Sequence, residues 1–242
     1  MKKFFHILYT VWALLIFHVF MIILLPFFII PPLLYKRGIV LSWKAIRLWS
    51  LLFSFFNRIT YKVEGSEVLE KKKNYVFVVN HTSFLDTPAL PQAIDLPFRA
   101  LAKKELTKIP LFGIIIKMVT EVVDRSSGAS RQKSKDRLNK VLAEESSILV
   151  FPEGTMNRTG ALLQSFYDGA FRIAIDAKAS MVPVVVVGAA KLMKPGSFLM
   201  KPGTVRVKVL PPIDAAAYTQ KQLLELKSLV RSQMEEELRK GV

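Results

Sequence analysis

The feature that most constrains how this chain folds is a long apolar run near its start. Between Phe4 and Tyr35 only His6, Thr10 and His18 place polar side chains in the run. About 20 apolar residues cross the hydrocarbon core of a bilayer as a helix, so the run is long enough to span one. It is far longer than the apolar part of a signal peptide, and no small-residue cleavage site follows it. We therefore predict that the run is retained as a membrane anchor.

A second apolar segment, from Val40 to Ile59, differs from the first because it carries charge. It mixes tryptophan, phenylalanine, isoleucine and leucine with Lys44, Arg47 and Arg58. A helix with apolar and aromatic residues on one side and basic residues on the other is typical of the membrane interface. The segment is thus predicted to be an interfacial amphipathic helix rather than a second clean span.

The basic residues also bear on the orientation of the anchor. Lys2 and Lys3 favour a cytoplasmic N-terminus, and the strongly basic remainder of the chain favours the same side. A single crossing would separate these two regions. A helical hairpin that dips into one leaflet, bent near Pro26 or Pro31–Pro32, keeps both on the cytoplasmic face of the membrane. We predict this hairpin for an anchoring region of residues 1–60.

The chain is strongly basic, and the distribution of its charge matters more than the total. Its net charge is +16, and no Asp or Glu occurs between Met1 and Val63. Such a region suits an anionic membrane surface, where each nearby Lys or Arg contributes about 1 kcal/mol. A nucleic-acid binder would also be basic. Here the basic residues interleave with long apolar runs instead of forming a polar stripe, so we expect a phospholipid bilayer as partner and no nucleic acid.

Several kinds of chemistry find no support in the sequence. Without cysteine, the chain has no disulfide framework, cysteine nucleophile or thiolate metal site. Of its three histidines, His6 and His18 lie in the apolar anchor, so His81 stands alone in the rest of the chain and a catalytic zinc site is not expected. Serine-hydrolase, Walker-type, dinucleotide-binding and H-E-x-x-H motifs are also missing. Acyl or phosphoryl transfer without a metal remains.

From about Tyr61 onward, short apolar runs alternate with helical stretches. This alternation indicates an α/β fold with a mixed, largely parallel sheet flanked by helices, which we assign to a domain of residues 61–242. Strands are expected at Tyr75–Val79, Phe98–Ala102, Glu121–Asp124, Ser147–Phe151, Met181–Val187 and Thr204–Leu210, and helices from about Phe84, at Thr107–Met118, Arg131–Glu145, Gly169–Ala179 and Gln222–Lys240.

The first candidate for chemistry follows directly after the Tyr75–Val79 strand. His81 stands there, with Asp86 five residues further on. Open α/β sheets bind their ligands just past the carboxyl ends of strands, and a histidine there can act as a general base near neutral pH. If Thr82 or Ser83 caps a helix, Asp86 lies in its first turns and can reach back to the imidazole. Alternatively, His81 is a turn residue and Asp86 only a carboxylate favoured by the helix dipole.

The second candidate is the segment Phe151–Thr155, which follows another buried strand. Pro152 and Gly154 indicate a sharp turn, whose backbone N–H groups can bind an anion or an oxyanion. Glu153 could hydrogen-bond a substrate hydroxyl, and Arg158 could clamp a phosphate. An ordinary strand-ending turn with a surface glutamate explains the same residues equally well.

A third candidate is the stretch from Lys103 to Gly113. Its lysines are possible phosphate ligands beside an apolar surface. Taken alone, such a stretch is more often the solvated start of a helix.

Taken together and in order, these segments resemble the glycerol-phosphate and lysophosphatidic acid acyltransferase family. Four blocks, N-H-x-x-x-x-D, K-x-E-L-x-x-x-P-x-x-G, F-P-E-G-T-R and V-P-[IV], occur in the family's order across roughly Tyr61 to Asp214. Each block alone is weak, whereas the four in order are highly specific. The matching residues are Asn80, His81 and Asp86; Lys103, Glu105, Leu106, Pro110 and Gly113; Phe151–Thr155; Val182–Val184; and, for the family's shorter G-A-F and D-R, Gly169–Phe171 and Asp124–Arg125.

The resemblance implies an enzyme of phospholipid synthesis that acylates the sn-2 hydroxyl of 1-acyl-glycerol 3-phosphate, making phosphatidic acid. His81 would take the proton from that hydroxyl, which attacks the thioester of acyl-CoA or acyl carrier protein. Asp86 would orient the imidazole, as in a catalytic triad that lacks the serine. No metal or cofactor beyond this acyl donor is implied. The residues expected to bind substrate are Lys103, Glu153, Gly154, Thr155 and Arg158.

One position departs from the family pattern. The family usually places an arginine straight after the threonine of the third block, where this chain has Met156. That arginine is expected to bind the phosphate of the acceptor, and Arg158 could replace it. The acceptor therefore stays open between lysophosphatidic acid, glycerol 3-phosphate and an amino-acid-containing lysolipid. A catalytically silent membrane scaffold is a further alternative, although a scaffold has no physical need for an intact His81, Asp86 and Glu153.

Overall fold

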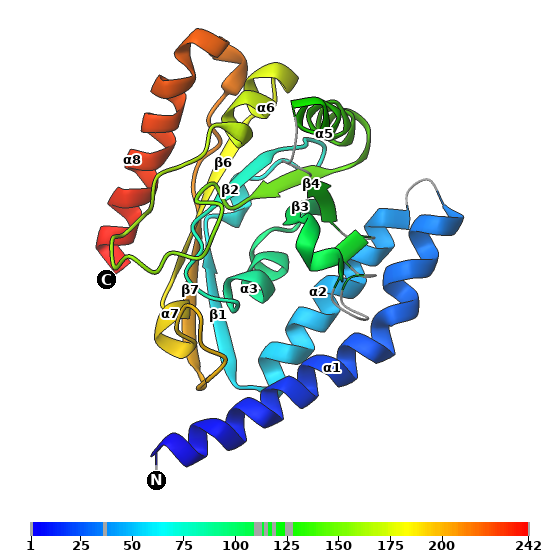
Figure 1. The fold of residues 1–242 in the computed structure, drawn as a ribbon, viewed down its shortest axis with the longest axis vertical. Helices are drawn as coiled ribbons and strands as arrows, with labels where there is room; N and C mark the ends of the chain where they lie inside the picture. The colour runs from blue at the N-terminus through cyan, green and yellow to red at the C-terminus, as the bar shows by residue number, and fades with distance from the viewer. Residues whose placement is uncertain are drawn as a thin grey trace.

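The centre of the protein is a seven-stranded sheet, seen in a computed structural model that describes residues 2–35, 38–108, 113, 116–117, 120–123 and 128–241. Its strands are β1 (Ile59–Glu64), β2 (Val76–Val79), β3 (Phe98–Lys103), β4 (Thr120–Val123), β5 (Ser147–Val150), β6 (Met181–Val187) and β7 (Gly203–Val209). They lie in the order β1-β7-β6-β2-β5-β3-β4, and neighbours are parallel except β6 and β7. The predicted α/β fold with a mixed, largely parallel sheet is confirmed (Figure 1).

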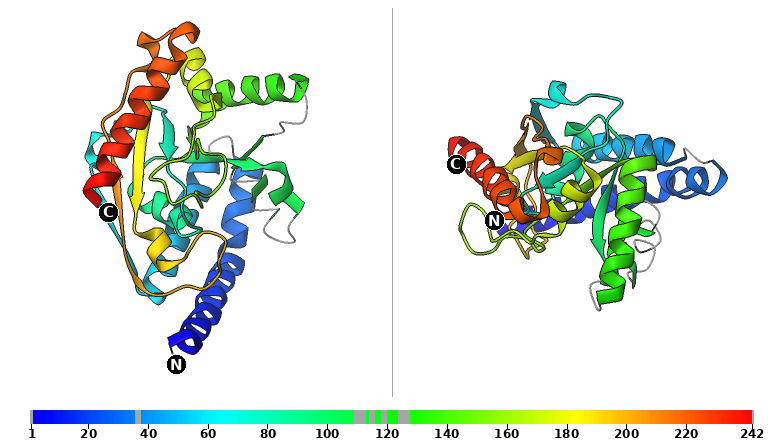
Figure 2. Two further views of the ribbon diagram at one scale, coloured as in Figure 1. Left: turned by 60° about the vertical axis from the view of Figure 1, so that its left-hand side comes forward. Right: turned by 90° about the horizontal axis from the view of Figure 1, so that it is seen from above.

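Helices cover both faces of this sheet (Figures 1 and 2). One face packs against α1 (Lys2–Leu34), α2 (Gly38–Phe56) and α3 (Asp86–Ala93), and the other against α5 (Gly128–Lys140), α6 (Gly169–Ala177) and α8 (Leu223–Gly241). Shorter helical segments are η1 (Ser66–Val68), η2 (Lys104–Lys108), η3 (Val141–Glu145), α7 (Ala189–Leu192), η4 (Ala215–Ala217) and η5 (Gln220–Gln222).

Strand β2 shows how the sequence produces a core on both faces. All of its residues are buried. Because successive side chains of a strand point to opposite faces, Phe77 and Val79 join the core under α1, α2 and α3, while Val76 and Val78 join the core under α5, α6 and α8. A strand buried on both sides is a continuous apolar run rather than an alternating pattern, so its place was predictable from the sequence.

Helices α1 and α2 form the hairpin expected at the start of the chain. They pack through aromatic side chains, with the ring of Phe17 edge-on to that of Trp49 at 5.1 Å between centroids. The chain turns after Leu34, close to Pro31–Pro32, while Pro26 lies inside α1 and makes no turn. Gly38 begins α2 so close to α1 that an added Cβ would lie 1.9 Å from a backbone oxygen of the facing turn. The hairpin's position within one leaflet stays a prediction.

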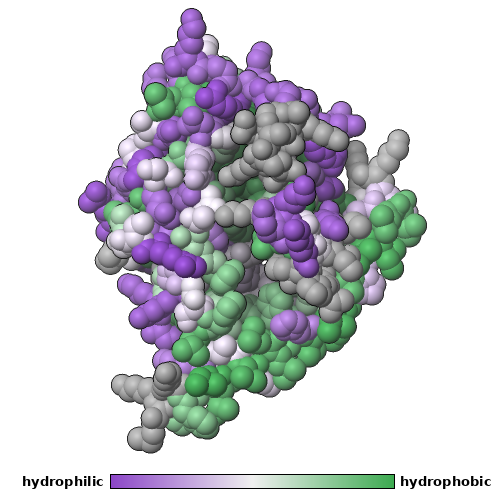
Figure 3. Space-filling view, in the orientation of Figure 1, coloured by the Kyte–Doolittle hydropathy of each residue, from purple (hydrophilic) through white to green (hydrophobic). Residues whose placement is uncertain are grey.

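The hairpin exposes a large apolar surface. Each of the two helices is long and apolar enough to cross a membrane, judged by length and composition. Figure 3 shows this apolar surface following α1 and α2, while the opposite end of the molecule is polar. Soluble monomers rarely expose contiguous apolar patches above a few hundred Å², so the surface suits lipid chains. Its most exposed members on α1 are Phe4, Phe5, Val11, Leu15, Ile22, Ile23, Phe27, Leu33 and Leu34.

The hairpin is also part of the core beneath the sheet. Ala13 of α1 is fully buried in the same cluster as the inner residues of β2. The Tyr9 hydroxyl donates to the backbone oxygen of Asn57 at 2.6 Å, and the hydroxyl oxygen of Thr10 accepts from the backbone N–H of Met200 at 2.9 Å. The predicted division at residue 60 falls close to the start of β1, and stays a prediction.

The predicted list of elements lacks one strand of the structure and includes one helix that lies largely outside the described residues. Strand β1 is absent from it, because Ile59 is assigned there to the end of the preceding helix; β1 lies at the edge of the sheet and is only half-buried. The predicted helix Thr107–Met118 lies largely outside the described residues, and the structure gives η2 just before it. Asp124–Arg125 also lie outside the described part.

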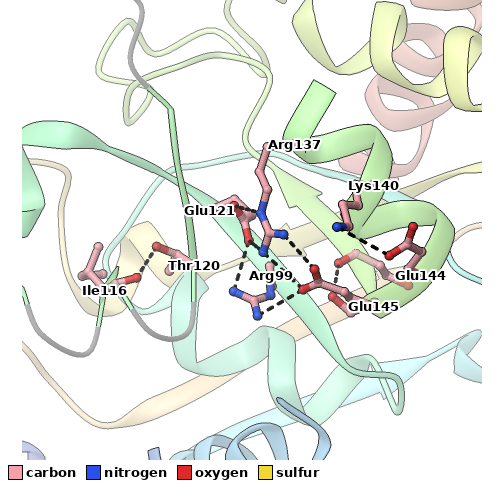
Figure 4. A network of polar contacts seen from close by, with 10 residues as sticks. Arg99, Ile116, Thr120, Glu121, Arg137, Lys140, Glu144 and Glu145 are labelled. Atoms are coloured by element: carbon pink, nitrogen blue, oxygen red, sulfur yellow. Dashed lines mark hydrogen bonds and ion pairs between the residues drawn. The ribbon is translucent and has the colours of Figure 1, made fainter. Parts of the chain in front are cut away.

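An ion-pair network joins β3, β4, α5 and η3 (Figure 4). Arg99 pairs with Glu121 at 3.1 Å and with Glu145 at 3.3 Å, and Arg137 pairs with the same two carboxylates at 3.3 and 2.8 Å. The side chains of Arg99 and Glu121 are only 13% and 11% exposed. The network therefore holds the far edge of the sheet to the helical layer, with its buried charges in the sheet and its more exposed ones in the helices.

Candidate active site

Strand β2 is followed directly by Asn80 and His81, at the carboxyl end of the central parallel strands. The fully buried Asn80 fixes this end: its side-chain nitrogen donates to the backbone oxygen of Val186 at 2.9 Å, and its oxygen accepts from the N–H of Val186 at 2.7 Å. The amide thus extends the pairing of β2 with β6 by one residue. As a result His81 leaves the sheet at a defined point.

The His81 imidazole faces the Asp86 carboxylate, as the first of the sequence blocks predicts. Nδ1 of His81 lies 3.0 Å from Oδ2 of Asp86. The Asp86 carboxylate is fully buried, whereas the histidine side chain is 16% exposed. Since an ionised carboxylate only accepts, the hydrogen bond places a proton on Nδ1 and leaves Nε2 as the acceptor of the neutral ring. The pair is arranged like the base and orienting acid of a triad.

Backbone groups hold Asp86 in place. Its Oδ2 accepts from the N–H of Thr82 at 2.6 Å and from the N–H of Ser83 at 2.8 Å. Asp86 is the first residue of α3, and the residue before it, Leu85, makes no side-chain cap. The sequence allowed Thr82 or Ser83 to cap the helix, but neither is the N-cap of α3. The Ser83 hydroxyl donates to the backbone oxygen of Met193 at 2.8 Å and accepts from the N–H of Leu85 at 3.2 Å, within the turn before the helix. The carboxylate is set by the tight turn before α3.

The hairpin supports the helix that carries Asp86. The Ser50 hydroxyl of α2 donates to the backbone oxygen of Pro88 in α3. From α3, the side-chain nitrogen of Gln92 donates to Ser50 Oγ at 2.7 Å and to Ser54 Oγ at 2.6 Å. These polar contacts are buried or partly buried between the two helices. The hairpin and the helix that carries Asp86 are thus joined directly.

The turn after β5 packs against His81. The Phe151 ring stacks on the imidazole at 4.2 Å between centroids and 23° between planes. Gly154 follows with φ +71°, a conformation that L side chains rarely adopt, and a Cβ there would lie 2.7 Å from the Tyr167 ring. The predicted sharp turn is present, with the N–H of Gly154 donating to the oxygen of Phe151 at 3.0 Å.

Glu153 lies inside the site rather than on the surface. It is 3% exposed; Oε1 accepts from the backbone N–H of His81 at 3.0 Å, and Oε2 accepts from that of Gln164 at 2.7 Å. Burial raises the pKa of Glu153, while the hydrogen bonds from these two N–H groups act to lower it. The carboxylate thereby ties the loop after β2 to two points of the loop between β5 and α6.

The other predicted substrate ligands differ in position. Thr155 and Arg158 are exposed on the same loop as Gly154, and Met156 between them is half-buried. The Arg158 guanidinium lies against Gly196, where an added Cβ would come within 3.0 Å of it. Lys103 ends β3, but its side chain lies outside the described part. Their roles in binding substrate stay predictions.

The comparisons with known proteins agree with this geometry. Residues 60–187 match the family model described as "Acyltransferase". The chain belongs to the acyltransferase family. The matched region runs from β1 through the end of β6 and therefore includes His81, Asp86 and the Phe151–Thr155 turn.

Several relatives of this acyltransferase carry one name. A protein of Saccharomyces cerevisiae named 1-acyl-sn-glycerol-3-phosphate acyltransferase is 32% identical over 204 residues, which cover 82% of this chain and 66% of the relative. One of that name from Limnanthes douglasii is 31% identical over 66% of this chain and 57% of its own length. The acyltransferase thus spans less than two thirds of the length of these two relatives.

A solved structure resembles the whole acyltransferase. The crystal structure of a 1-acyl-sn-glycerophosphate (LPA) acyltransferase from Thermotoga maritima superposes with a TM-score of 0.84 over 99% of this chain and 97% of the other, at 24% identity. At this identity the match shows a shared fold. It includes the apolar hairpin, because nearly all of both chains is aligned.

Sequence reasoning missed several residues that shape the site of this acyltransferase. Buried Asn157 donates its N–H to the backbone oxygen of His81 at 2.7 Å and accepts from the Thr159 hydroxyl at 2.8 Å. The local run Asn157-Arg158-Thr159-Gly160 is typical of an Asx turn and could have indicated this. The stacking of Phe151 on His81 has no such local signal. Among the described residues no three His, Asp or Glu side chains gather as metal ligands would.

Proposed function

We propose that this acyltransferase moves a fatty acyl group from acyl-CoA or acyl carrier protein to the sn-2 hydroxyl of 1-acyl-glycerol 3-phosphate. The product is phosphatidic acid, for phospholipid synthesis. The observation that carries the proposal is the 3.0 Å contact between Nδ1 of His81 and the buried carboxylate of Asp86. Relatives named for this reaction support the choice of acceptor.

In the proposed mechanism the acceptor hydroxyl gives its proton to Nε2 of His81. The hydroxyl oxygen then forms a bond to the thioester carbonyl carbon, and the thiolate leaves and takes a proton. Asp86 stabilises the imidazolium during the step, because its charge is held beside Nδ1. General-base assistance of this kind contributes about 10²–10⁴-fold in rate. The reaction needs no metal or cofactor.

Acceptor binding is assigned to the loop after β5. Arg158 is exposed there and can pair with a phosphate, in place of the arginine that the family has where this chain has Met156. Lys103 is a second phosphate ligand in this proposal, and Gly154 and Thr155 line the acceptor. Glu153 accepts from two backbone N–H groups in this structure, so its part in binding is to hold the loop.

The protein acts at the cytoplasmic face of the membrane in this proposal. The apolar surface of α1 and α2 supports membrane attachment, and the absence of acidic residues before Glu64 favours anionic lipid. The lipid acceptor and product then stay in the bilayer while the thioester arrives from the aqueous side. A hairpin in one leaflet brings the site to the acceptor without a crossing.

The test follows thiol release from palmitoyl-CoA with lysophosphatidic acid as acceptor, in detergent, for wild type, His81→Ala and His18→Ala. His18 is a matched control, because its imidazole lies in α1 and bonds to the backbone of Leu14. We expect acceptor-dependent turnover to fall about 10²–10⁴-fold in His81→Ala and to persist in His18→Ala. Equal turnover in all three proteins would contradict the role of His81.

The same assay separates the acceptors that Met156 leaves in competition. Glycerol 3-phosphate and an amino-acid-containing lysolipid replace lysophosphatidic acid at equal concentration. The proposal expects the highest kcat/KM with lysophosphatidic acid. A higher kcat/KM with glycerol 3-phosphate would contradict the assigned acceptor but not the role of His81 as the base.

A further inference from the structure

A loop between α7 and β7 exposes two large apolar side chains beside the site. Phe198 is 65% exposed and Leu199 is 40% exposed. The Phe198 ring stacks on Phe84, with centroids 5.7 Å apart and planes 8° apart. Phe84 is itself 48% exposed and stands three residues after His81 in the sequence. We call Phe84, Phe198 and Leu199 the apolar patch.

The loop that carries the apolar patch has a fixed shape. The N–H of Ser197 donates to the oxygen of Lys194 at 3.0 Å, and that of Leu199 donates to Ser197 Oγ at 3.1 Å. The following residue, Met200, is buried, and Lys201 donates its N–H to the oxygen of Leu192 at 3.0 Å. The two apolar side chains are therefore held outward by a structured turn rather than by a loose tip.

The apolar patch is continuous with the apolar surface of α1. Met200, next to Leu199, donates its N–H to the hydroxyl of Thr10 on α1 at 2.9 Å. On that helix Val11 is 61% exposed and Trp12 is 45% exposed. Figures 1 and 2 show the loop between α7 and β7 lying beside the N-terminal half of α1. Loop and helix thus present apolar side chains side by side.

Basic residues border the apolar patch. Lys191, Lys194 and Lys201 are all exposed, and no acidic residue occurs from position 177 to position 213. Exposed aromatic and aliphatic side chains flanked by lysines are the composition of surfaces that enter an anionic bilayer, where the apolar groups reach the acyl boundary and the lysines meet phosphates. A protein partner with an acidic rim would need the same composition, but continuity with α1 favours lipid.

We propose that the apolar patch is a second membrane contact, which inserts into an anionic phospholipid bilayer beside α1. This inference concerns the surface and does not depend on the proposed reaction. Together, α1 and the patch define a plane, so the protein has one orientation on the membrane instead of pivoting on the hairpin. His81, three residues before Phe84, is then held close to the lipid headgroups, where an acceptor hydroxyl would lie.

The test uses the fact that the chain has no cysteine, so a single introduced thiol can be labelled. Leu199→Cys and Leu224→Cys are each labelled with a polarity-sensitive fluorophore and reconstituted into vesicles of phosphatidylcholine and phosphatidylglycerol. Leu224 is the matched control: it is 65% exposed and lies in the first turn of α8, which packs on the face of the sheet opposite α1. Neither residue belongs to the proposed catalytic machinery.

We expect the label at position 199 to shift to shorter emission wavelengths on reconstitution, and to be quenched by nitroxide-labelled lipid but not by aqueous iodide. The label at position 224 should keep its emission wavelength, and it should be quenched by aqueous iodide but not by nitroxide-labelled lipid. Equal iodide quenching at both positions would overturn the proposal. Protection at position 199 that depends on protein concentration in detergent, without lipid, would also overturn it, by indicating a second copy of the chain as the partner.

A second measurement tests the basic border. Lys194→Gln combined with Lys201→Gln is compared with wild type by the emission of the label at position 199, in vesicles with and without phosphatidylglycerol. We expect the wild-type shift to be larger with the anionic lipid, and the double substitution to remove that difference. A shift that is the same with neutral and anionic vesicles in wild type would overturn the part of the proposal that names anionic lipid.

Discussion

Two clusters of buried or partly buried carboxylates lie on this sheet, and they have different kinds of bonding partner. Asp86 is bound by two backbone N–H groups and by the His81 ring, with no arginine or lysine among its bonded partners in the described residues. Glu121 and Glu145 instead share two guanidinium groups, those of Arg99 and Arg137 (Figure 4). The first cluster contains a base that can gain a proton. In the second, the partners of the carboxylates are arginines, which already carry their protons.

The difference separates chemistry from support. Arginine stays protonated throughout the accessible pH range, so the Arg99 network cannot exchange protons with a substrate. The imidazole of His81 can accept a proton at Nε2, its partner Asp86 is fully buried, and its own side chain is 16% exposed to solvent. We therefore expect changes in the first cluster to act on turnover and changes in the second to act on stability.

The largest expected effect comes from Asp86→Asn, which keeps the size of the side chain. Because Oδ2 alone accepts from Nδ1 of His81 and from the N–H groups of Thr82 and Ser83, an amide oxygen in its place keeps these bonds but carries no charge to stabilise the imidazolium. We expect kcat to fall about 10²–10⁴-fold with a small change in unfolding temperature. Steady-state thiol release and thermal unfolding in detergent measure the two effects. A variant with a much lower unfolding temperature but an unchanged kcat would contradict the role of Asp86.

The next effect is expected from Arg99→Met in the second cluster. This change leaves Glu121 without one cation in a site where its side chain is 11% exposed, and removing one partner of a buried pair costs about 3–5 kcal/mol. We expect a lower unfolding temperature and an unchanged kcat per folded molecule. Adding Glu121→Gln should restore part of the loss, because it removes the unpaired charge. A fall in kcat without a loss of stability in Arg99→Met would contradict the assignment of this second cluster to structural support.

A smaller effect is expected in the turn that supports His81. Gly154→Ala places a Cβ against Tyr167 in a left-handed conformation, while Gly160→Ala is a matched control with φ +80° and no atom within 4 Å of its added Cβ. Both changes incur the backbone strain of about 1–2 kcal/mol. We expect Gly154→Ala to lose about 1–3 kcal/mol more in the free energy of unfolding. Equal losses in the free energy of unfolding would mean that the Tyr167 ring moves away from the added Cβ at no measurable cost.

The smallest effect is a pH dependence from Glu153. Its pKa is raised in the folded protein, mainly by burial, so the folded state binds this proton more tightly than the unfolded state. The stabilisation from Glu153 is therefore greatest at low pH and is lost as pH rises through the raised pKa. The free energy of unfolding of Glu153→Gln minus that of wild type should therefore be larger at about pH 7 than at about pH 4. A stability difference independent of pH would contradict the raised pKa.

The sequence was most informative where a local pattern sufficed. Val76–Val79 is apolar throughout because both of its faces are buried, and this pattern alone placed the central strand. The spacing of His81 and Asp86 allowed a contact, and their resemblance to a family block favoured it. The contact itself depends on a turn in which Thr82 and Ser83 donate their N–H groups, while the sequence suggested that a side chain of these residues capped the helix.

Long-range contacts account for what the sequence did not reveal. Glu153 bonds to the N–H of a residue 72 positions away, and Met200 bonds to Thr10 across 190 positions. Such partners are chosen by the packing of the sheet and the hairpin, and no local pattern records them. The same reason explains why Glu153 was expected on the surface or at a substrate, although it lies buried between two loops.

The burial of Ala13 beneath the sheet has a consequence for how such proteins can diverge. An anchor that serves only as a tether can be exchanged for any other membrane helix without changing the enzyme. Here α1 fills part of the core and α2 braces α3, so the anchor must match the residues it packs against. Chimeras that join this hairpin to another catalytic region should fail to fold unless its contacts with α3 and Met200 are transferred with it.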